Sequence, residues 1–366
     1  MEHPENDDLY KGLKVNKGVA DVPTVNPYLK KRIQRKEYTP AEFVEGILKG
    51  NITILSQAVT LVESSKYEHQ QVAQEIIEKC LPHAGKSVRI GITGVPGAGK
   101  STSIDAFGMH LIGQGRKLAV LAIDPSSERS KGSILGDKTR MEGLSREKNA
   151  FIRPSPSAGS LGGVARKTRE TIVLCEAAGF DTVFVETVGV GQSETAVHSM
   201  VDFFLLIQLA GTGDELQGIK RGIMEMADGI IINKADGDNL EKAKLAAAQF
   251  RNALHLFPAP ESSWSPKVLT YSGYYNLGIK EIWDMVGEYM EFTQKNGYFN
   301  YKRNEQAKYW MYESINDTLR ETFYHNPAVE KMLNFTEQQV LNNEISSFVA
   351  AKRMMDLFLE NLSAKK

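Results

Sequence analysis

The chain has 366 residues, of which 42% are hydrophobic and 24% are charged, so it is long enough for about two globular domains with a substantial core. Its 44 basic and 45 acidic residues leave a formal net charge of −1, which gives no indication of binding to nucleic acid or to an anionic membrane surface. The two cysteines, Cys80 and Cys175, lie far apart in segments with helical patterning, which favours buried thiols over a disulfide or a metal site.

The first residues of the chain are acidic and contain no apolar run, unlike a secretory signal or an Arg-rich transit peptide. The most apolar runs, 118–123 and 203–207, are far too short to cross a bilayer. These features predict a cytoplasmic protein in a reducing compartment, without a membrane partner. A basic cluster at 30–36 could bind phosphate or a partner, but a solvated surface is favoured because few aromatic residues interleave with it.

A helical arm is predicted within residues 1–85. Thr39 suits the N-cap of its first helix, Pro40 suits the first helical position, and Glu42 completes a capping box. Two further amphipathic helices are predicted from apolar residues at helical spacing, one with Leu55, Ala58 and Val62 and one with Val72, Ile76 and Cys80.

A glycine-rich loop follows an alternating apolar run at 88–93 and precedes a helix-compatible segment that ends near Gly113. Its sequence, GVPGAGKS, has the G-x-x-x-x-G-K-[ST] spacing of a phosphate-binding loop. Glycines let backbone N–H groups converge on a phosphate, and the helix N-terminus adds partial positive charge. Lys100 can reach the β- and γ-phosphates, and the Ser101 hydroxyl can ligate Mg²⁺. We therefore predict a nucleotide site that includes Gly97, Ala98, Gly99, Lys100, Ser101 and Thr102.

Strand and helix patterns alternate from residue 87 to about residue 295. Further apolar strands are predicted at 118–123, 151–153, 182–185, 203–207, 229–232 and 267–270, with a helix at about 161–178. This alternation predicts an α/β fold of the P-loop NTPase kind, with a mostly parallel sheet flanked by helices, over residues 86–295. Ligands of such sheets bind beyond the carboxyl ends of the strands, where polar residues stand in this sequence: Asp124, Glu186, Asn233 and Ser272.

The sequence Asn233-Lys234-Ala235-Asp236, directly after an apolar strand, indicates which nucleotide binds. A carboxylate placed like Asp236 can accept hydrogen bonds from guanine N1–H and the 2-amino group, donors that adenine lacks at those positions. Asn233 can support the base edge or the neighbouring loop, and the Lys234 stem can lie against the base. Together with Ser272 and Gly273 after the last strand, these residues predict GTP and GDP as ligands.

Magnesium ligation requires hard oxygen donors, and four are available: Ser101, Asp124, Asp137 and Glu186. Glu186 occupies a Walker-B-like position, and the Gly189 N–H could contact the γ-phosphate as a switch glycine. The alternative for each acid is that it caps a helix or pairs with a nearby cation.

Hydrolysis requires a positioned water and stabilisation of developing charge, and Lys100, Glu186 and Asp124 are the candidates for this work. No side chain is an obvious catalytic base, and Gln192 fits a structural loop residue as well as a catalytic one. We therefore expect slow GTP hydrolysis until a partner supplies or orders the missing groups.

Beyond about residue 296 the alternation stops, and residues 296–366 are predicted to form helices. Met311, Ile315, Leu319 and Phe323 form one apolar stripe. A second stripe is predicted from Leu341, Ile345, Phe348, Met355, Leu359 and Leu362. Such faces need a cover, which could be the main domain or a second copy of the chain, and dimerisation is favoured.

Five segments together resemble one protein family: Gly94–Thr102, Asp124–Ser127 (DPSS), Glu186–Glu194 (ETVGVGQSE), Gly211–Lys220 (GTGDELQGIK) and Asn233–Asp236 (NKAD). The chain is similar to the methylmalonyl-CoA mutase-associated GTPase chaperones, members of which were also labelled arginine/ornithine transport kinases. The segments at Glu186 and Gly211 carry the family identity, since the other motifs occur in many GTPases.

The resemblance implies a GTPase that assists an adenosylcobalamin-dependent acyl-CoA mutase, with methylmalonyl-CoA mutase as the first candidate. It implies that the protein gates cofactor delivery from a cobalamin adenosyltransferase, protects the mutase, and forms a homodimer through its C-terminal helices. By the same resemblance, 124–140, 186–192 and 214–220 are switch segments, and Gln217 and Lys220 couple the nucleotide state to the mutase. From its residues alone, 214–220 is typical of a capped helix start.

Three alternatives stay open on the sequence. A kinase acting on a transport protein would need an acceptor site and a catalytic base, neither of which is visible. A nickel-enzyme metallochaperone GTPase would carry a Cys/His metal site, whereas Cys80 has only His83 nearby. A non-hydrolysing nucleotide-binding adaptor is disfavoured by the intact Lys100 and Ser101.

Overall fold

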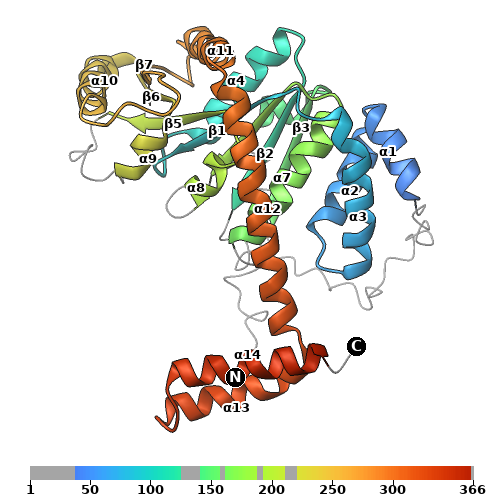
Figure 1. The fold of residues 1–366 in the computed structure, drawn as a ribbon. Helices are drawn as coiled ribbons and strands as arrows, with labels where there is room; N and C mark the ends of the chain where they lie inside the picture. The colour runs from blue at the N-terminus through green and yellow to red at the C-terminus, as the bar shows by residue number, and fades with distance from the viewer. Residues whose placement is uncertain (1–37, 125–140, 157–160, 188–192, 211–220, 364–366) are drawn as a thin grey trace, which may run out of the picture. The chain divides into compact units, whose positions relative to one another are not determined.

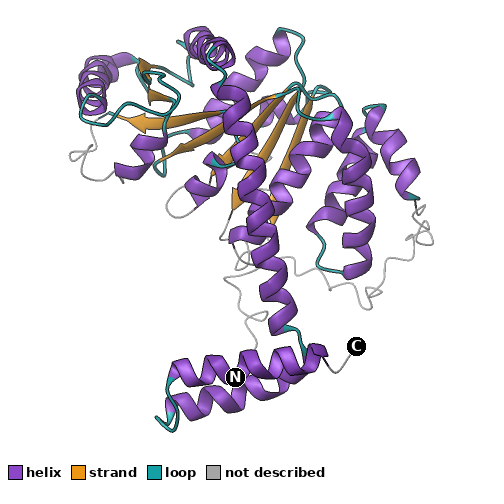
Figure 2. Ribbon diagram, in the orientation of Figure 1, coloured by secondary structure: helices purple, strands orange, loops and turns teal. Residues whose placement is uncertain are grey.

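The computed structural model describes residues 38–124, 141–156, 161–187, 193–210 and 221–363 as a parallel sheet with helices on both faces (Figure 1, Figure 2). Seven strands pair in the order β3-β2-β4-β1-β5-β6-β7. They are β1 (Val88–Gly94), β2 (Leu118–Asp124), β3 (Ala150–Pro156), β4 (Thr182–Thr187), β5 (Phe203–Leu209), β6 (Gly229–Asn233) and β7 (Lys267–Thr270). The predicted fold class is confirmed.

The helices before the fifth strand are α1 (Pro40–Leu48), α2 (Ile52–Glu63), α3 (Tyr67–Cys80), the short 3-10 helix η3 (Leu81–His83), α4 (Lys100–Gly113), α6 (Glu142–Ser145), α7 (Leu161–Ala177) and α8 (Ser193–His198). Those after it are α9 (Arg221–Met226), η4 (Gly237–Asn239), α10 (Leu240–Leu254), α11 (Ile279–Lys295), α12 (Tyr298–Tyr324), α13 (Pro327–Leu341) and α14 (Ser347–Ser363). The three helices predicted for the N-terminal arm correspond to α1, α2 and α3.

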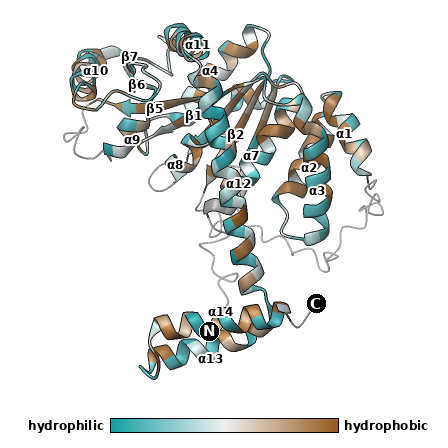
Figure 3. Cartoon of the chain, viewed as in Figure 1, coloured by the Kyte–Doolittle hydropathy of each residue, from teal (hydrophilic) through white to brown (hydrophobic). Residues whose placement is uncertain are grey.

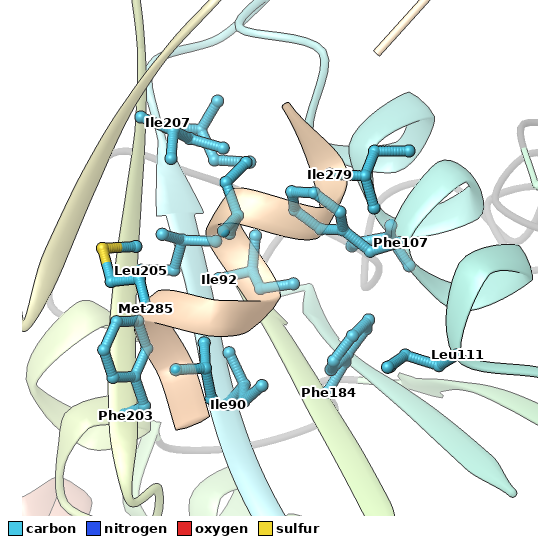
Figure 4. Packing of buried hydrophobic residues seen from close by; sticks show 14 of the residues in the cluster. Ile90, Ile92, Phe107, Leu111, Phe184, Phe203, Leu205, Ile207, Ile279 and Met285 are labelled. Atoms are coloured by element: carbon cyan, nitrogen blue, oxygen red, sulfur yellow. The ribbon is translucent and has the colours of Figure 1, made fainter. Parts of the chain in front are cut away.

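The central strands form because their apolar runs are buried on both faces of the sheet, and Figure 3 shows the hydrophobic colouring of these strands. Figure 4 shows one face, where Ile90 and Ile92 of β1 pack with Phe107 of α4 and with Ile279 and Met285 of α11. On the other face, Gly91 leaves no room for a Cβ atom, which would lie 2.9 Å from Val197 Cγ1 and 2.7 Å from Phe204 Cδ2. A larger residue there would separate β1 from α8 and β5.

The strand β3 is longer than the predicted 151–153. It pairs with β2 along its whole length, up to Asp124 opposite Pro156. Pro154 and Pro156 are tolerated because β3 lies at the edge of the sheet, where a strand has a neighbour on one side only.

The N-terminal helices are tied to the main domain by polar contacts. Arg153 of β3 forms an ion pair with Glu63 of α2, and Lys167 Nζ of α7 donates to the Glu63 carbonyl at 2.9 Å. Gln74 Nε2 of α3 donates to Glu170 Oε1 of α7 at 2.9 Å. These contacts hold α2 and α3 against α7 and the edge strand.

A buried ionic network lies at the amino-terminal end of β1. Arg89 Nε and Nη2 donate to the two carboxylate oxygens of Glu176 at 2.8 and 3.0 Å. Ser87 Oγ and the Gly85 N–H donate to the same carboxylate at 2.5 and 2.6 Å. Burial alone would raise the pKa of Glu176, but the hydrogen bonds and charge of Arg89, with those of Ser87 and Gly85, hold this pKa below its ordinary value.

The two cysteines are buried free thiols on α3 and α7, as predicted. Burial raises the pKa of Cys80 to about 11 and raises the pKa of Cys175 further. Neither thiol is therefore ionised near neutral pH.

The C-terminal helices confirm one predicted stripe and correct the other. Met311, Ile315 and Leu319 do lie along α12, with 52%, 47% and 61% of their surface exposed. The stripe predicted from Leu341 to Leu362 is wrong as a single helix, because α13 ends at Leu341 and Asn343 has a left-handed backbone with φ 57° before α14 begins.

Residues predicted for the second stripe lie on the outer side of α14, as expected for a face that needs a cover: Phe348, Met355 and Leu359 are 86%, 46% and 54% exposed. The residues Met354 and Phe358 of α14 pack inward and meet Val329 of α13. Among the residues that the structure describes, no helix is both long and apolar enough to cross a membrane.

Candidate functional site

The predicted phosphate-binding loop connects β1 to α4, and its backbone has the conformation that its glycines allow. Gly97 and Gly99 have φ values of +79° and +83°, which side-chain-bearing residues rarely adopt. Gly99 is the N-cap of α4, a helix of 14 residues that begins at Lys100. Its first N–H groups and its dipole therefore point toward the loop, which is an arrangement suited to a phosphate.

Lys100 lies over this loop and is only 9% exposed. Its Nζ donates to the Gly94 carbonyl at 2.9 Å and to the Val95 carbonyl at 3.4 Å. Burial lowers the pKa of Lys100, and the charges of Glu186 and Glu194 oppose this shift. The cation is thus held by neutral carbonyl groups, which phosphate oxygens could replace with stronger charge-assisted bonds.

Two of the predicted magnesium ligands lie together. Ser101 Oγ donates to Glu186 Oε1 at 3.4 Å, and Glu186 is the second-last residue of β4, where it pairs with Ile92 of β1. The Glu186 side chain is 7% exposed, so its charge is largely removed from water. A hydroxyl and a carboxylate in this position are the oxygen donors that Mg²⁺ prefers, and the residues present fit this ion.

The remaining phosphate-side predictions are not all described. Asp124 is the last residue of β2, in register with Pro156 of β3, so its backbone stands at the carboxyl edge of the sheet as predicted. Asp137, Gly189 and Lys220 lie outside the described residues, as do Gln192 and Gln217.

Asn233 joins the predicted base pocket to the phosphate loop. Its Nδ2 donates to the Ala98 carbonyl at 2.7 Å, and its Oδ1 accepts from the N–H groups of Lys234 and Gly273 at 2.7 and 3.2 Å. The side chain is 3% exposed. A glycine is required at position 99, next to the Asn233 side chain, because a Cβ atom there would lie 2.7 Å from Asn233 Nδ2.

Asp236 faces the loop that follows β7. Ser272 Oγ donates to Asp236 Oδ2 at 2.5 Å, which fixes the carboxylate, and the Tyr275 N–H donates to the same Ser272 hydroxyl at 3.3 Å. Lys234 is exposed, and its φ of 58° lies in the left-handed region. Its side chain therefore leaves the backbone in a different direction from that of a residue in an extended strand. The structure therefore brings Asn233, Asp236, Ser272 and Gly273 together, and their role in nucleotide binding stays a prediction.

Three further side chains lie near these loops and have no individually predicted role: Thr93, Thr187 and Glu194. Thr187 Oγ1 donates to Thr93 Oγ1 at 2.8 Å, which ties the end of β4 to the end of β1. Glu194, in the first turn of α8, is 2% exposed and close enough to Lys100 to act on its pKa. Glu194 is the last residue of the ETVGVGQSE segment, and this membership was the available signal.

Comparisons with known proteins agree with this geometry. The family model described as "Methylmalonyl Co-A mutase-associated GTPase MeaB" matches residues 55–328. A GTPase of Caulobacter vibrioides is 50% identical over 312 residues, which cover 85% of this chain and 95% of that protein. The Mus musculus protein named methylmalonic aciduria type A homolog, mitochondrial, is 45% identical over 323 residues, which cover 86% of this chain and 78% of that protein.

A solved structure shares the fold as well as the sequence. The crystal structure of LAO/AO transport system kinase superposes with a TM-score of 0.69 at 38% identity, over 88% of this chain and 99% of that one. The match to the family model, the extent of these relatives and the motifs described above agree, and the resemblance drawn from the sequence is confirmed. The chain belongs to the MeaB family of methylmalonyl Co-A mutase-associated GTPases.

Proposed function

We propose that this GTPase binds GTP and GDP with Mg²⁺ and uses the nucleotide state to assist an adenosylcobalamin-dependent acyl-CoA mutase. The observation that supports the binding of GTP and GDP is the contact of Asn233 with both the Ala98 carbonyl and the Gly273 N–H. Through it, the loop suited to phosphate and the loops suited to guanine form one connected surface.

On the phosphate side, Lys100 and the N–H groups of 97–102 bind the β- and γ-phosphates, and Lys100 leaves the Gly94 carbonyl to do so. Ser101 and Glu186, with Asp124 and Asp137, hold the Mg²⁺, and the Gly189 N–H contacts the γ-phosphate. When bound, the ion neutralises charge on the phosphate oxygens. Lys220 belongs to a switch segment that responds to the nucleotide.

On the base side, the Asp236 carboxylate accepts from guanine N1–H and the 2-amino group while Ser272 orients it. Asn233 holds the loops of the base pocket together by its hydrogen bonds, and the Lys234 stem covers the base. Gly273 contributes its backbone N–H, which donates to Asn233 Oδ1. The protein would thereby bind both GTP and GDP and discriminate against adenine nucleotides.

The proposed client is methylmalonyl-CoA mutase, and a cobalamin adenosyltransferase is a possible second partner. This proposal is supported by the description of the family and by the name of the mouse relative. In this role the GTPase gates cofactor loading and protects the mutase. Hydrolysis by the isolated protein is expected to be slow.

We further propose that the protein is a homodimer formed through residues 296–366. Its support is the exposed apolar face of α12, together with a groove of about 590 Å³ between α13, α14 and the end of α12. Phe323, Leu333, Ala350 and Met354 are among the groove residues. We treat residues 1–85, 86–295 and 296–366 as the functional divisions of the chain.

The client is tested by affinity capture from an extract of the native cells, with the purified protein loaded with GDP or with a non-hydrolysable GTP analogue. Recovery of a cobalamin-dependent mutase that depends on the nucleotide is the expected result. Capture of transport proteins alone, together with phosphate transfer to them from labelled nucleotide, would support the kinase alternative that the name of the related crystal structure suggests. Stoichiometric nickel binding would support the metallochaperone alternative.

A further inference from the structure

Several polar contacts of the helix α12 meet one short segment of the GTPase domain, the end of α8 and the turn 199–202 that follows it. Other contacts of α12 reach Arg169 of α7 and Asp228 before β6. Gln306 Nε2 donates to the Val201 carbonyl at 2.8 Å and to the His198 carbonyl at 3.4 Å. Trp310 Nε1 donates to the Ser199 carbonyl at 3.0 Å. Both side chains are 6% exposed, so these bonds are shielded from water.

One helical turn earlier, charged side chains of α12 reach the same turn. Lys302 Nζ donates to the Asp202 carbonyl at 2.8 Å, and Arg303 donates to both Asp202 carboxylate oxygens at 2.7 and 2.8 Å. Arg303 also donates to the carbonyls of Gly85 and Ser87. Residues 302, 306 and 310 are spaced by four, and Arg303 is three residues before Gln306, so all of these donors lie on one face of α12.

The other end of α8 lies beside the predicted phosphate site. Ser193 and Glu194, in its first turn, are 3% and 2% exposed. The Glu194 carboxylate acts to raise the pKa of Lys100, the residue proposed to exchange its contact with the Gly94 carbonyl for a phosphate. Along its length α8 packs on β1, since a Cβ atom on Gly91 would lie 2.9 Å from Val197 Cγ1 and 3.0 Å from Val201 Cγ2.

The short length of α8 makes it suitable for transmitting a displacement. It has six residues, about 9 Å of helix, and its ends contact two different parts of the protein. Packed helices move as units, because a filled interior resists deformation. A shift of its first turn would therefore carry the turn 199–202 with it.

We propose that α8 and the turn 199–202 transmit the nucleotide state to α12, and so to the C-terminal helices. This inference rests on the proposed binding of GTP and GDP at the Lys100 loop. It assigns Gln306 and Trp310 as positioning residues that act on the site through α8, without touching the nucleotide. Figure 1 shows α12 continuing toward α13 and α14, the elements that would respond.

Thermodynamic reciprocity makes the inference measurable. If the nucleotide biases the position of α12, then loosening α12 must change the relative affinities for the two nucleotides by the same coupling. We expect Gln306→Met and Trp310→Phe each to change the ratio of the affinities for GDP and a non-hydrolysable GTP analogue by about threefold or more. Both substitutions remove a donor while keeping much of the apolar volume.

The matched control is Trp264→Phe. Trp264 Nε1 donates to the Asp228 carbonyl at 2.9 Å, and the residue is 8% exposed. Trp264 lies outside α12 and this bond does not reach the turn 199–202; the Asp228 carboxylate, which pairs with Lys302 of α12 at 3.6 Å, is left unchanged by the substitution. This variant loses the same kind of buried bond and is expected to keep the wild-type affinity ratio. Circular dichroism and thermal unfolding identify the variants that remain folded, and Gln306→Met decides the matter if Trp310→Phe unfolds.

A second readout uses Trp310 itself. In a protein with Trp264→Phe and Trp283→Phe, Trp310 is the remaining tryptophan, since the chain has three. Its emission is expected to differ between the GDP-bound and analogue-bound forms. The inference is overturned if the folded α12 variants keep the wild-type affinity ratio and the Trp310 emission is the same with both nucleotides. Failure of the wild-type protein to bind either nucleotide would instead overturn the proposed function.

Discussion

At the scale of single residues, the Asp236 carboxylate carries the proposed preference for guanine. Asp236→Asn keeps the size of the side chain and replaces one acceptor oxygen with a donor, which opposes the 2-amino group of guanine. We expect the affinity for GTP to fall about 100-fold, because an unpaired polar group in a closed pocket is costly. Xanthine has an oxygen at that position, so the affinity for xanthosine triphosphate should rise. Competition binding with the two nucleotides measures both changes.

Asp238→Asn is the matched control, because Asp238 lies in the same loop and is exposed. It should bind GTP like the wild type. Equal losses for both nucleotides in Asp236→Asn would contradict direct recognition of the base and indicate a disordered loop. In that case the substitution would have weakened the hydrogen bond from Ser272, which orients Asp236 whether or not a base is present.

Glu186 is a second residue whose role can be tested, because its carboxylate contacts Ser101 and is proposed to hold Mg²⁺. Glu186→Gln keeps an acceptor for the Ser101 hydroxyl and removes the negative charge. The Mg²⁺ concentration that gives half-maximal GTP hydrolysis should rise about tenfold or more, as it does when groups that hold a metal are weakened. A magnesium titration of phosphate release measures it. An unchanged magnesium requirement would remove Glu186 from the ion site.

At the scale of elements, the ion pair of Arg89 and Glu176 links β1 to α7 and should make stability depend on pH. The pKa of Glu176 is lowered in the folded protein, so the unfolded chain binds a proton more readily. The stabilisation is therefore complete above the ordinary carboxyl value of 4.5 and is lost as the pH falls through the lower folded value.

The variant Glu176→Gln isolates this contribution. It should be less stable than the wild type at pH 7, because Arg89 is left buried without its counter-charge, and the difference should shrink as the pH falls below about 4.5. Urea unfolding at pH values between about 3 and 7 gives both curves. A constant difference over that range would show that the pair contributes packing alone. The exposed pair of Lys49 and Glu45 provides a control in Glu45→Gln.

The elements also show which parts of the fold a sequence can predict. The strands β1, β2, β4, β5 and β6 were predicted nearly to their ends, because each is buried on both faces and its apolar run stops where the strand stops. The break between α13 and α14 was missed because Ile345 continues the apolar spacing across it. The signal was nevertheless present, since Asn342 and Asn343 suit a helix end with a left-handed residue and Ser346 suits the start of the next helix.

The site was predictable for a different reason. Phosphate and base loops have short, fixed motifs, and parallel strands bring their carboxyl ends to one edge of the sheet. The contacts between those loops were not predictable, because Asn233 and Ala98 are separated by 135 residues and meet only after the sheet has formed. The same is true of Trp310 and Ser199, which are 111 residues apart.

At the scale of the whole molecule, a single chain leaves an apolar face of α12 exposed to solvent. Met311, Ile315 and Leu319 are about half exposed and are spaced by four residues, so they form one continuous face. Burying such a face against a second copy removes apolar surface from water, at about 25 cal/mol per Å². The proposed dimer should therefore have twice the chain mass of 40.6 kDa in sedimentation velocity.

The double variant Ile315→Arg and Leu319→Arg tests this surface, because a charge on each chain would be brought to an apolar interface. It should sediment as a monomer while its secondary structure stays that of the wild type, since neither residue is buried within one chain. Asp317→Arg reverses a charge about 200° around the same helix from Ile315 and should remain dimeric. A double variant that stays dimeric would place the interface elsewhere.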